Sequence, residues 1–182
     1  MLVSVRFAGM GGQGVIFSGI ALARAAALYE GGSSREIYSV QTQAYGPEAR
    51  GGSSKSDVKI SDREEFYPFV NTPDFLIVMS QPAYERYIES TRKETVVFLD
   101  EGSVESRPSL HYYEVPATGK AEEISKRIVA NVVMLGAFVE ISEVVSKRAV
   151  LSALADISPK GTEGLNRRAY ELGVALGQEL KE

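Results

Sequence analysis

The chain has 182 residues, of which 44% are hydrophobic and 24% are charged, so its length and composition are those of one globular domain. Its net charge of -4 disfavours a nucleic-acid-binding protein, which would present a basic face. The chain has no cysteine and one histidine, which excludes a thiolate-bound iron–sulfur cluster, a disulfide, a cysteine nucleophile and a histidine-rich metal site.

No run of apolar residues reaches the roughly 18–20 positions that a membrane-spanning helix needs. Residues 2–8 read as a strand that meets glycines at once, not as a signal peptide. The absence of cysteine also fits a cytoplasmic protein. We therefore expect a cytoplasmic location, with no membrane partner and no nucleic-acid partner.

In chain order, the first predicted unit is a strand over residues 2–8, a glycine-rich loop and a helix over 15–29. Two strands follow, over 36–43 and 53–60, and the loop between them has no helix, so the sheet should be mixed. The alternation of the strand over 53–60 predicts two faces, one with Ser54, Ser56, Val58 and Ile60 and the other with Lys55, Asp57 and Lys59.

Residues 74–80 are nearly all apolar, which predicts a strand covered on both faces. A short helix over 81–87 has a proline in its first turn. A buried strand over 95–99 and a weaker strand over 111–115 come next. Helices fill the rest, with two predicted apolar faces: Ile124, Ile128, Leu135 and Val139, then Leu165, Ala169, Leu172, Leu176 and Leu180.

Strands that alternate with helices predict an α/β protein. We expect a single three-layer-like domain over residues 1–182, with a mixed, mostly parallel sheet and helices on its faces. Its first β-α unit should be Rossmann-like. No internal repeat, low-complexity segment or linker divides the chain.

The loop over residues 9–14, GMGGQG, fits the pattern G-x-G-x-x-G between a strand and a helix. Such glycines bring backbone N–H groups near an anion at a helix N-terminus. A dinucleotide site would also need an acid at the end of the second strand, which ends in Gln41-Thr42-Gln43, so NAD binding is disfavoured. No Gly-Lys-Ser/Thr follows, which disfavours ATP hydrolysis. A phosphate site and a tight turn for helix–strand packing both stay open.

A second unusual segment reads YGPEARGG over residues 45–52, with an aromatic residue, a proline, an acid, an arginine and three glycines. Its glycines and proline predict two turns that hold Glu48 and Arg50 between them. The planar guanidinium of Arg50 suits a phosphate or a carboxylate. A surface turn with an ion pair between Glu48 and Arg50 is the plainer interpretation, but the density of special residues favours a functional loop.

The strings GMGGQGV, SVQTQAYGPEARGGSSKSDVKIS and YPFVNTPDFLIVMSQPAYERY resemble, in order and spacing, the gamma subunit of 2-oxoacid:ferredoxin oxidoreductases. The resemblance spans essentially the whole chain, including residues 131–136 and 166–173. It implies one gamma-type pyruvate/ketoisovalerate oxidoreductase catalytic domain over residues 1–182. The QTQ and SSKSDVKIS segments resemble the 2-oxoglutarate type more than the pyruvate or ketoisovalerate type.

The resemblance implies a complex that oxidatively decarboxylates a 2-oxoacid with CoA and ferredoxin, giving an acyl-CoA and carbon dioxide. It places thiamine diphosphate and the iron–sulfur clusters in partner subunits, named alpha and beta, with a ferredoxin-like delta subunit as a further candidate partner. It also associates this domain with CoA binding and closure of the active site. The chain by itself is then expected to bind no cofactor and to be inactive.

The residues that match the family's motifs lie in two loops, which we expect to meet at one end of the sheet, facing the catalytic subunits. These predicted CoA-binding residues are Gly9, Gly11, Gly12, Gln13 and Gly14 in the first loop and Tyr45, Gly46, Glu48, Arg50, Gly51 and Gly52 in the second. We predict no catalytic acid, base, nucleophile or metal ligand, and interpret His111 as an ordinary strand residue. Two alternatives are a stand-alone nucleotide-binding protein, suggested by the glycine spacing, and a purely structural subunit.

Overall fold

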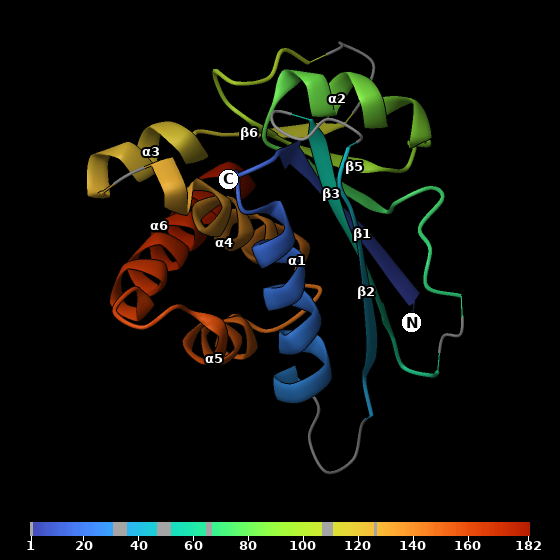
Figure 1. Ribbon diagram of the computed structural model, residues 1–182, viewed down its shortest axis with the longest axis horizontal. Coiled ribbons are helices and arrows are strands. Elements are labelled where there is room, and N and C mark those ends of the chain that lie inside the picture. Colours follow the sequence, from blue (N-terminus) through green and yellow to red (C-terminus); the bar gives the residue numbers. More distant parts are fainter. Residues whose placement is uncertain (1, 31–35, 47–51, 65–66, 107–110, 126) are drawn as a thin grey trace.

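The computed structural model describes residues 2–30, 36–46, 52–64, 67–106, 111–125 and 127–182, and places six strands in one sheet (Figure 1). The strand order is β2-β3-β1-β4-β5-β6. The strands are β1 (Leu2–Met10), β2 (Tyr38–Ala44), β3 (Ser53–Ser61), β4 (Phe75–Val78), β5 (Val96–Asp100) and β6 (Tyr112–Val115).

The sheet is mixed and mostly parallel, as predicted. β3 pairs antiparallel with β1 and with β2, whereas β1, β4, β5 and β6 pair in parallel. Each predicted strand is present, and its ends lie within two residues of those expected.

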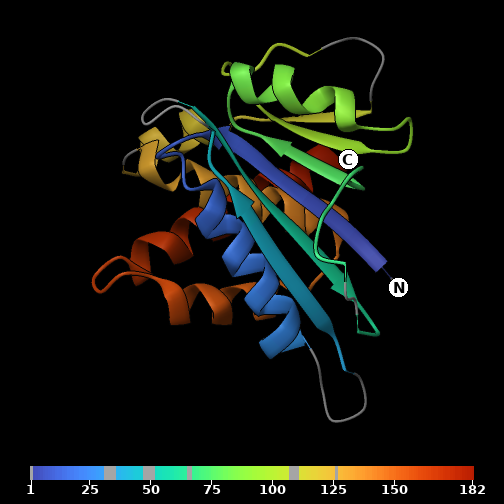
Figure 2. The same cartoon turned by 45° about the vertical axis from the view of Figure 1, so that its right-hand side comes forward.

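Helices cover both faces of the sheet (Figures 1 and 2). One face carries α1 (Val15–Arg24), α4 (Ala130–Ser142), α5 (Lys147–Ile157) and α6 (Glu163–Lys181); a π-helical turn over Ala25–Glu30 extends α1. The opposite face carries α2 (Gln81–Tyr87), which packs against β1 and β4. This arrangement confirms the predicted α/β fold with helices on the faces of the sheet. No described helix is both long and apolar enough to cross a membrane.

Phe138 of α4 joins the helical layer to the sheet. Its ring packs edge-on against Phe7 of β1, Phe75 of β4 and Phe98 of β5, with ring centroids 5.9, 5.4 and 5.4 Å apart. Edge-to-face contacts at these distances are favourable beyond the area that they bury. Phe138 therefore sets the position of α4 over three neighbouring strands.

A buried ion pair lies on the face of the sheet that α2 covers. Nε of Arg6 donates to Oδ1 of Asp57 at 2.6 Å, and Nη2 donates to Oδ2 at 2.9 Å. Arg6 also donates to Ser90 and to the carbonyl of Val70, and Lys55 donates to Asp57 at 2.5 Å. Asp57 thus shares a face with Lys55, as the alternation predicted, yet it is 1% exposed because the chain after β3 and the end of α2 cover it.

The predicted apolar face of Ile124, Ile128, Leu135 and Val139 is wrong. The chain there is divided into α3 (Ala117–Ile124), a 3-10 turn η3 (Arg127–Val129) and α4. Ser125 leaves the helical conformation at φ -170° and ψ -90°, so the helical phase is lost between α3 and α4. Ile128 is consequently 71% exposed, whereas Leu135 and Val139 are buried.

The second predicted apolar face is confirmed, since all five of its residues lie on α6 and are buried or half-buried. Close packing of α6 on α4 depends on glycine. A Cβ on Gly173 would overlap the carbonyl oxygen of Val133, and a Cβ on Gly136 would overlap that of Tyr170. The two helix backbones therefore touch, which leaves no room for a methyl group.

We predict that Gly173→Ala lowers the free energy of unfolding by about 3 kcal/mol, because the added methyl group must separate α4 from α6. Gly164→Ala is the matched control on the same helix, since a Cβ there meets nothing within 4 Å. It should raise stability by up to about 1 kcal/mol through helix propensity. Denaturant unfolding measures both, and a Gly173→Ala variant as stable as the control would contradict the packing.

Candidate functional site

The two predicted loops meet at one end of the sheet. The backbone N–H of Gly11 donates to the carbonyl oxygen of Gly52 at 3.1 Å, which joins the loop after β1 to the start of β3. Tyr45, Gly46 and Gly52 are the described residues of the second loop. Glu48, Arg50 and Gly51 lie outside the described residues, so their predicted role stays a prediction.

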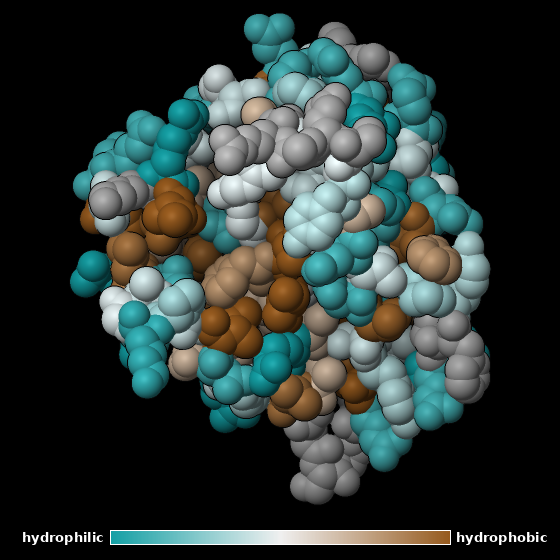
Figure 3. Space-filling model, viewed as in Figure 1, coloured by the Kyte–Doolittle hydropathy of each residue, from teal (hydrophilic) through white to brown (hydrophobic). Residues whose placement is uncertain are grey.

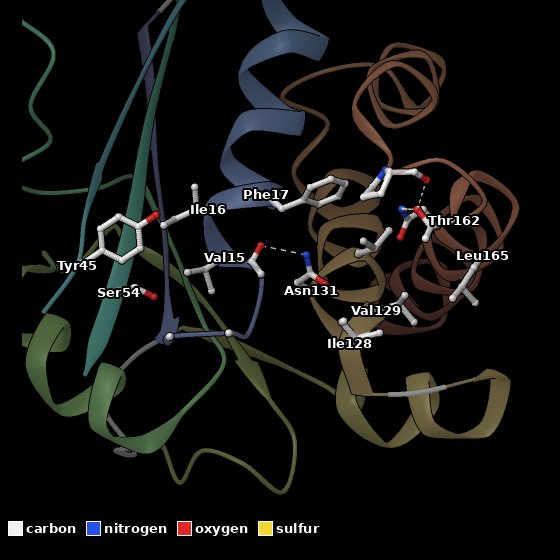
Figure 4. A pocket seen from close by; sticks show the side chains of 16 residues that line it. Val15, Ile16, Phe17, Tyr45, Ser54, Ile128, Val129, Asn131, Thr162 and Leu165 are labelled. Atoms are coloured by element: carbon white, nitrogen blue, oxygen red, sulfur yellow. Dashed lines mark hydrogen bonds between the residues drawn. The ribbon is translucent and has the colours of Figure 1, made fainter. Parts of the chain in front are cut away.

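A pocket of about 430 Å³ opens beside these loops, between α1 and the helices α4 and α6 (Figure 4). Hydrophobic side chains gather over α1 and α4 on the same side of the molecule (Figure 3). None of the described residues that line the pocket is charged. They are Gly11, Gly12, Gly14, Val15, Ile16, Phe17, Tyr45, Ser54, Ile128, Val129, Asn131, Val132, Pro159, Thr162, Leu165 and Asn166.

The outer glycines of the first loop are required for packing. A Cβ on Gly14 would lie 2.6 Å from Nδ2 of Asn131, and the φ of Gly14 is +75°. A Cβ on Gly9 would lie 2.7 Å from Oε1 of Gln13. The packing interpretation of the glycine motif therefore applies to these two positions.

The inner glycines face open space instead. A Cβ on Gly11 would meet only the carbonyl oxygen of Gly52, at 3.9 Å, and a Cβ on Gly12 would meet nothing within 4 Å. Gly12 has a φ of +94°, a conformation that favours glycine. Both glycines line the pocket, so they leave the backbone accessible to a ligand.

Gln13 holds the loop in place. Its Oε1 accepts a hydrogen bond from the N–H of Met10 at 2.6 Å, and its Nε2 donates to the carbonyl of Met79 at 2.8 Å. Both ends of the side-chain amide are therefore engaged within the protein. Gln13 connects the glycine loop to the end of β4. These two hydrogen bonds already explain why a glutamine occupies this position, without the predicted contact to a ligand.

Asn131, at the start of α4, is a pocket residue. It belongs to a segment that resembles the family, but it was not among the candidate site residues predicted from the sequence. Its Nδ2 donates to the carbonyl of Gly14 at 3.0 Å (Figure 4). It also donates to the hydroxyl of Ser18 at 3.3 Å. Its Oδ1 is buried and has no hydrogen-bond partner among the described residues. In the sequence, Asn131 is an isolated polar amide within an apolar run. Because buried polar atoms normally have a hydrogen-bond partner, such an amide could have indicated a specific contact.

The N-terminus of α1 adds a partial positive charge to the pocket. The N–H of Ser18 bonds to the carbonyl of Gly14, so the N–H groups that precede it lie before the first helical hydrogen bond. Gly14, the N-cap residue, has no side chain to cap them, and the first turn has no acidic residue. Helix N-termini of this kind favour anions.

The pocket is thus equipped to bind a ligand, because it combines an apolar wall, an unpaired amide oxygen and backbone N–H groups. None of its described lining residues is a carboxylate, histidine or lysine that could act as a general acid or base. Among the described residues, no cluster of three or more metal-ligating side chains is present either.

The sequence family described as pyruvate ferredoxin/flavodoxin oxidoreductase matches residues 4–176. The 2-oxoglutarate synthase subunit KorC of Methanocaldococcus jannaschii is 45% identical, over 99% of this chain and 96% of the relative. KorC of Methanothermobacter thermautotrophicus is 44% identical, over 96% and 95%. The crystal structure of a keto/oxoacid ferredoxin oxidoreductase gamma subunit from Geobacter sulfurreducens has a TM-score of 0.85 and 34% identity, over 99% of this chain and 98% of that one.

We predict that Gly14→Ala and Gly11→Ala differ sharply in stability. Gly14→Ala should cost about 2–3 kcal/mol, because the methyl group meets Asn131 and the backbone is left-handed. Gly11→Ala should change the free energy of unfolding by less than about 1 kcal/mol, since its Cβ enters open space. Urea unfolding of both variants is the measurement, and equal losses would show that the inner glycines also serve packing.

Proposed function

Because this chain belongs to the pyruvate ferredoxin/flavodoxin oxidoreductase family, we propose that it is the gamma subunit of a multisubunit 2-oxoacid:ferredoxin oxidoreductase that uses 2-oxoglutarate. The near full-length identity with 2-oxoglutarate synthase subunits supports this substrate. The complex would oxidatively decarboxylate the 2-oxoacid with CoA, giving an acyl-CoA, carbon dioxide and reduced ferredoxin.

The redox and decarboxylation cofactors belong, in this proposal, to the alpha and beta subunits. A chain without cysteine offers no thiolate for an iron–sulfur cluster. A ferredoxin-like delta subunit and ferredoxin itself are the further proposed partners, and the complex is assigned to the cytoplasm. This chain then contributes binding surface, not the chemical step.

The proposed role of the chain is to bind CoA and to help close the active site. The observation that carries it is the pocket formed where Gly11 bonds to Gly52, beside the N-terminus of α1. The phosphates of CoA suit the N–H groups of this helix end and the guanidinium of Arg50. The amides and apolar arm of CoA suit the unpaired Oδ1 of Asn131 and the apolar wall.

We predict that Arg50→Ala raises the CoA KM of the reconstituted complex about tenfold or more, with the subunit composition unchanged. The reason is the loss of a charge-assisted hydrogen bond worth roughly 1.5–3 kcal/mol. Arg63→Ala, beyond the opposite end of β3, is the control and should leave CoA dependence as it is. If Arg50→Ala behaves like this control, the second loop is scaffold and the CoA assignment of Arg50 fails.

The same end of the sheet exposes large apolar side chains, including Tyr45 at 69% and Ile128 at 71%. Apolar groups left exposed on a free chain are typical of surfaces that a partner covers. We predict that Ile128→Glu reduces co-purification of the alpha and beta subunits without changing the stability of the isolated chain. Leu28→Glu is the control, because Leu28 is 58% exposed at the far end of the α1 extension. Equal recovery of partners with both variants would place the interface elsewhere.

A further inference from the structure

A second cavity, of about 670 Å³, opens at the carboxyl ends of β1, β4 and β5. The helix after β1 covers one face of the sheet and the helix after β4 covers the other (Figures 1 and 2). Such a divergence in an open α/β sheet leaves a crevice in which ligands bind. Among the described residues, Gly12 and Ile128 alone line both this crevice and the pocket beside the two loops, so the two cavities are distinct neighbours.

Ser80 lines the crevice at the start of α2 and is 6% exposed. A serine at this position usually caps its helix by accepting from the N–H of the second or third helical residue. The second residue here is Pro82, which has no N–H, and the Ser80 side chain makes no capping bond. No described group pairs with its buried hydroxyl. A ligand oxygen or nitrogen would supply the missing partner.

One cationic side chain lines the crevice. Arg127 is the only charged residue among the described residues that line it. The nearby carboxylate of Asp100 accepts from the N–H of Thr118 at 2.9 Å and from its hydroxyl at 2.5 Å, so it is engaged at the start of α3. An anionic ligand is therefore favoured.

Arg127 forms an ion pair at the surface, and this pair does not prevent its guanidinium from binding an anionic ligand. Nε of Arg127 lies 3.4 Å from Glu122, and both side chains are more than half exposed. Exposed pairs of this kind contribute little to stability. Arg127 can therefore turn to an anion in the crevice at small cost.

The remaining wall of the crevice is largely apolar and includes Met10, Met79 and Pro82. An anion that also has a flat apolar body matches this combination better than a simple ion does. We infer that the crevice binds a nucleotide through its phosphate, with the base against the apolar wall. The volume lies within the roughly 300–1,000 Å³ typical of small-molecule sites. A free mononucleotide and the nucleotide end of CoA both have this chemistry.

Calorimetry on the purified full-length chain tests the site with AMP, adenosine and inorganic phosphate. AMP should bind at least about tenfold more tightly than either fragment. Ser80→Ala should weaken AMP binding about fivefold, and Arg127→Ala about tenfold or more, from the loss of one neutral and one charge-assisted hydrogen bond.

Two control variants match these substitutions. Ser142→Ala removes another buried serine hydroxyl that lacks a partner, at the end of α4. Arg167→Ala removes an arginine whose side chain is 70% exposed, against 71% for Arg127, and which has its own surface partner in Glu171. Both controls should leave the AMP affinity unchanged.

The site is overturned if AMP does not bind, or if the Ser80 and Arg127 variants bind it like the controls. Phosphate that binds as tightly as AMP would overturn the nucleotide assignment. If CoA and AMP compete, the crevice binds the nucleotide end of CoA. If both bind at the same time, the crevice binds a separate mononucleotide. Either result supports a nucleotide site in the crevice. The AMP measurements involve no 2-oxoacid turnover, so a failure of AMP binding leaves the proposed oxidoreductase function untouched. The competition with CoA rests on the proposed CoA binding.

Discussion

The contact between Gly14 and Asn131 connects the start of α1 to the start of α4, and the apolar pocket beside the two loops depends on it. The carbonyl of Gly14 accepts from the Asn131 amide at 3.0 Å, across 117 positions of the chain. A side chain on Gly14 would occupy the space of that amide. The contact places the free N–H groups of α1 against α4, where an apolar wall and an unpaired amide oxygen are available.

The rest of the core keeps α4 in this position. Phe138 fixes the helix over β1, β4 and β5, and the glycines of the α4–α6 contact bring the two helix backbones together. On the other face of the sheet, Arg6 connects Asp57 to Ser90, beyond the end of α2. Removing one partner of a buried ion pair leaves an uncompensated charge, so this pair stabilises the contact of β1 and β3 with the turn that follows α2.

The glycine loop separates two cavities of different chemistry. On one side lies an apolar pocket in which no described lining residue is charged, and on the other lies a crevice with an arginine and serine hydroxyls. Gln13 and the outer glycines hold the loop in position, whereas Gly12 lines both cavities. A subunit built in this way suits ligand positioning within a larger enzyme more than an independent chemical step.

The sequence by itself determined the six strands, the helices that follow the first and fourth strands, the mixed sheet and the apolar face of α6, because hydrophobic periodicity and turn residues are local properties. Its motifs also indicated the family and the two loops that meet. Only the tertiary structure decided which glycines pack and which face a ligand, and that Asn131 and Ser80 have unpaired polar atoms. It also decided that Asp57 is buried and that Ile128 is exposed. Those features depend on contacts between residues far apart in the chain. Periodicity predicts which residues share a face of a helix or strand, but it does not predict which other segment covers that face.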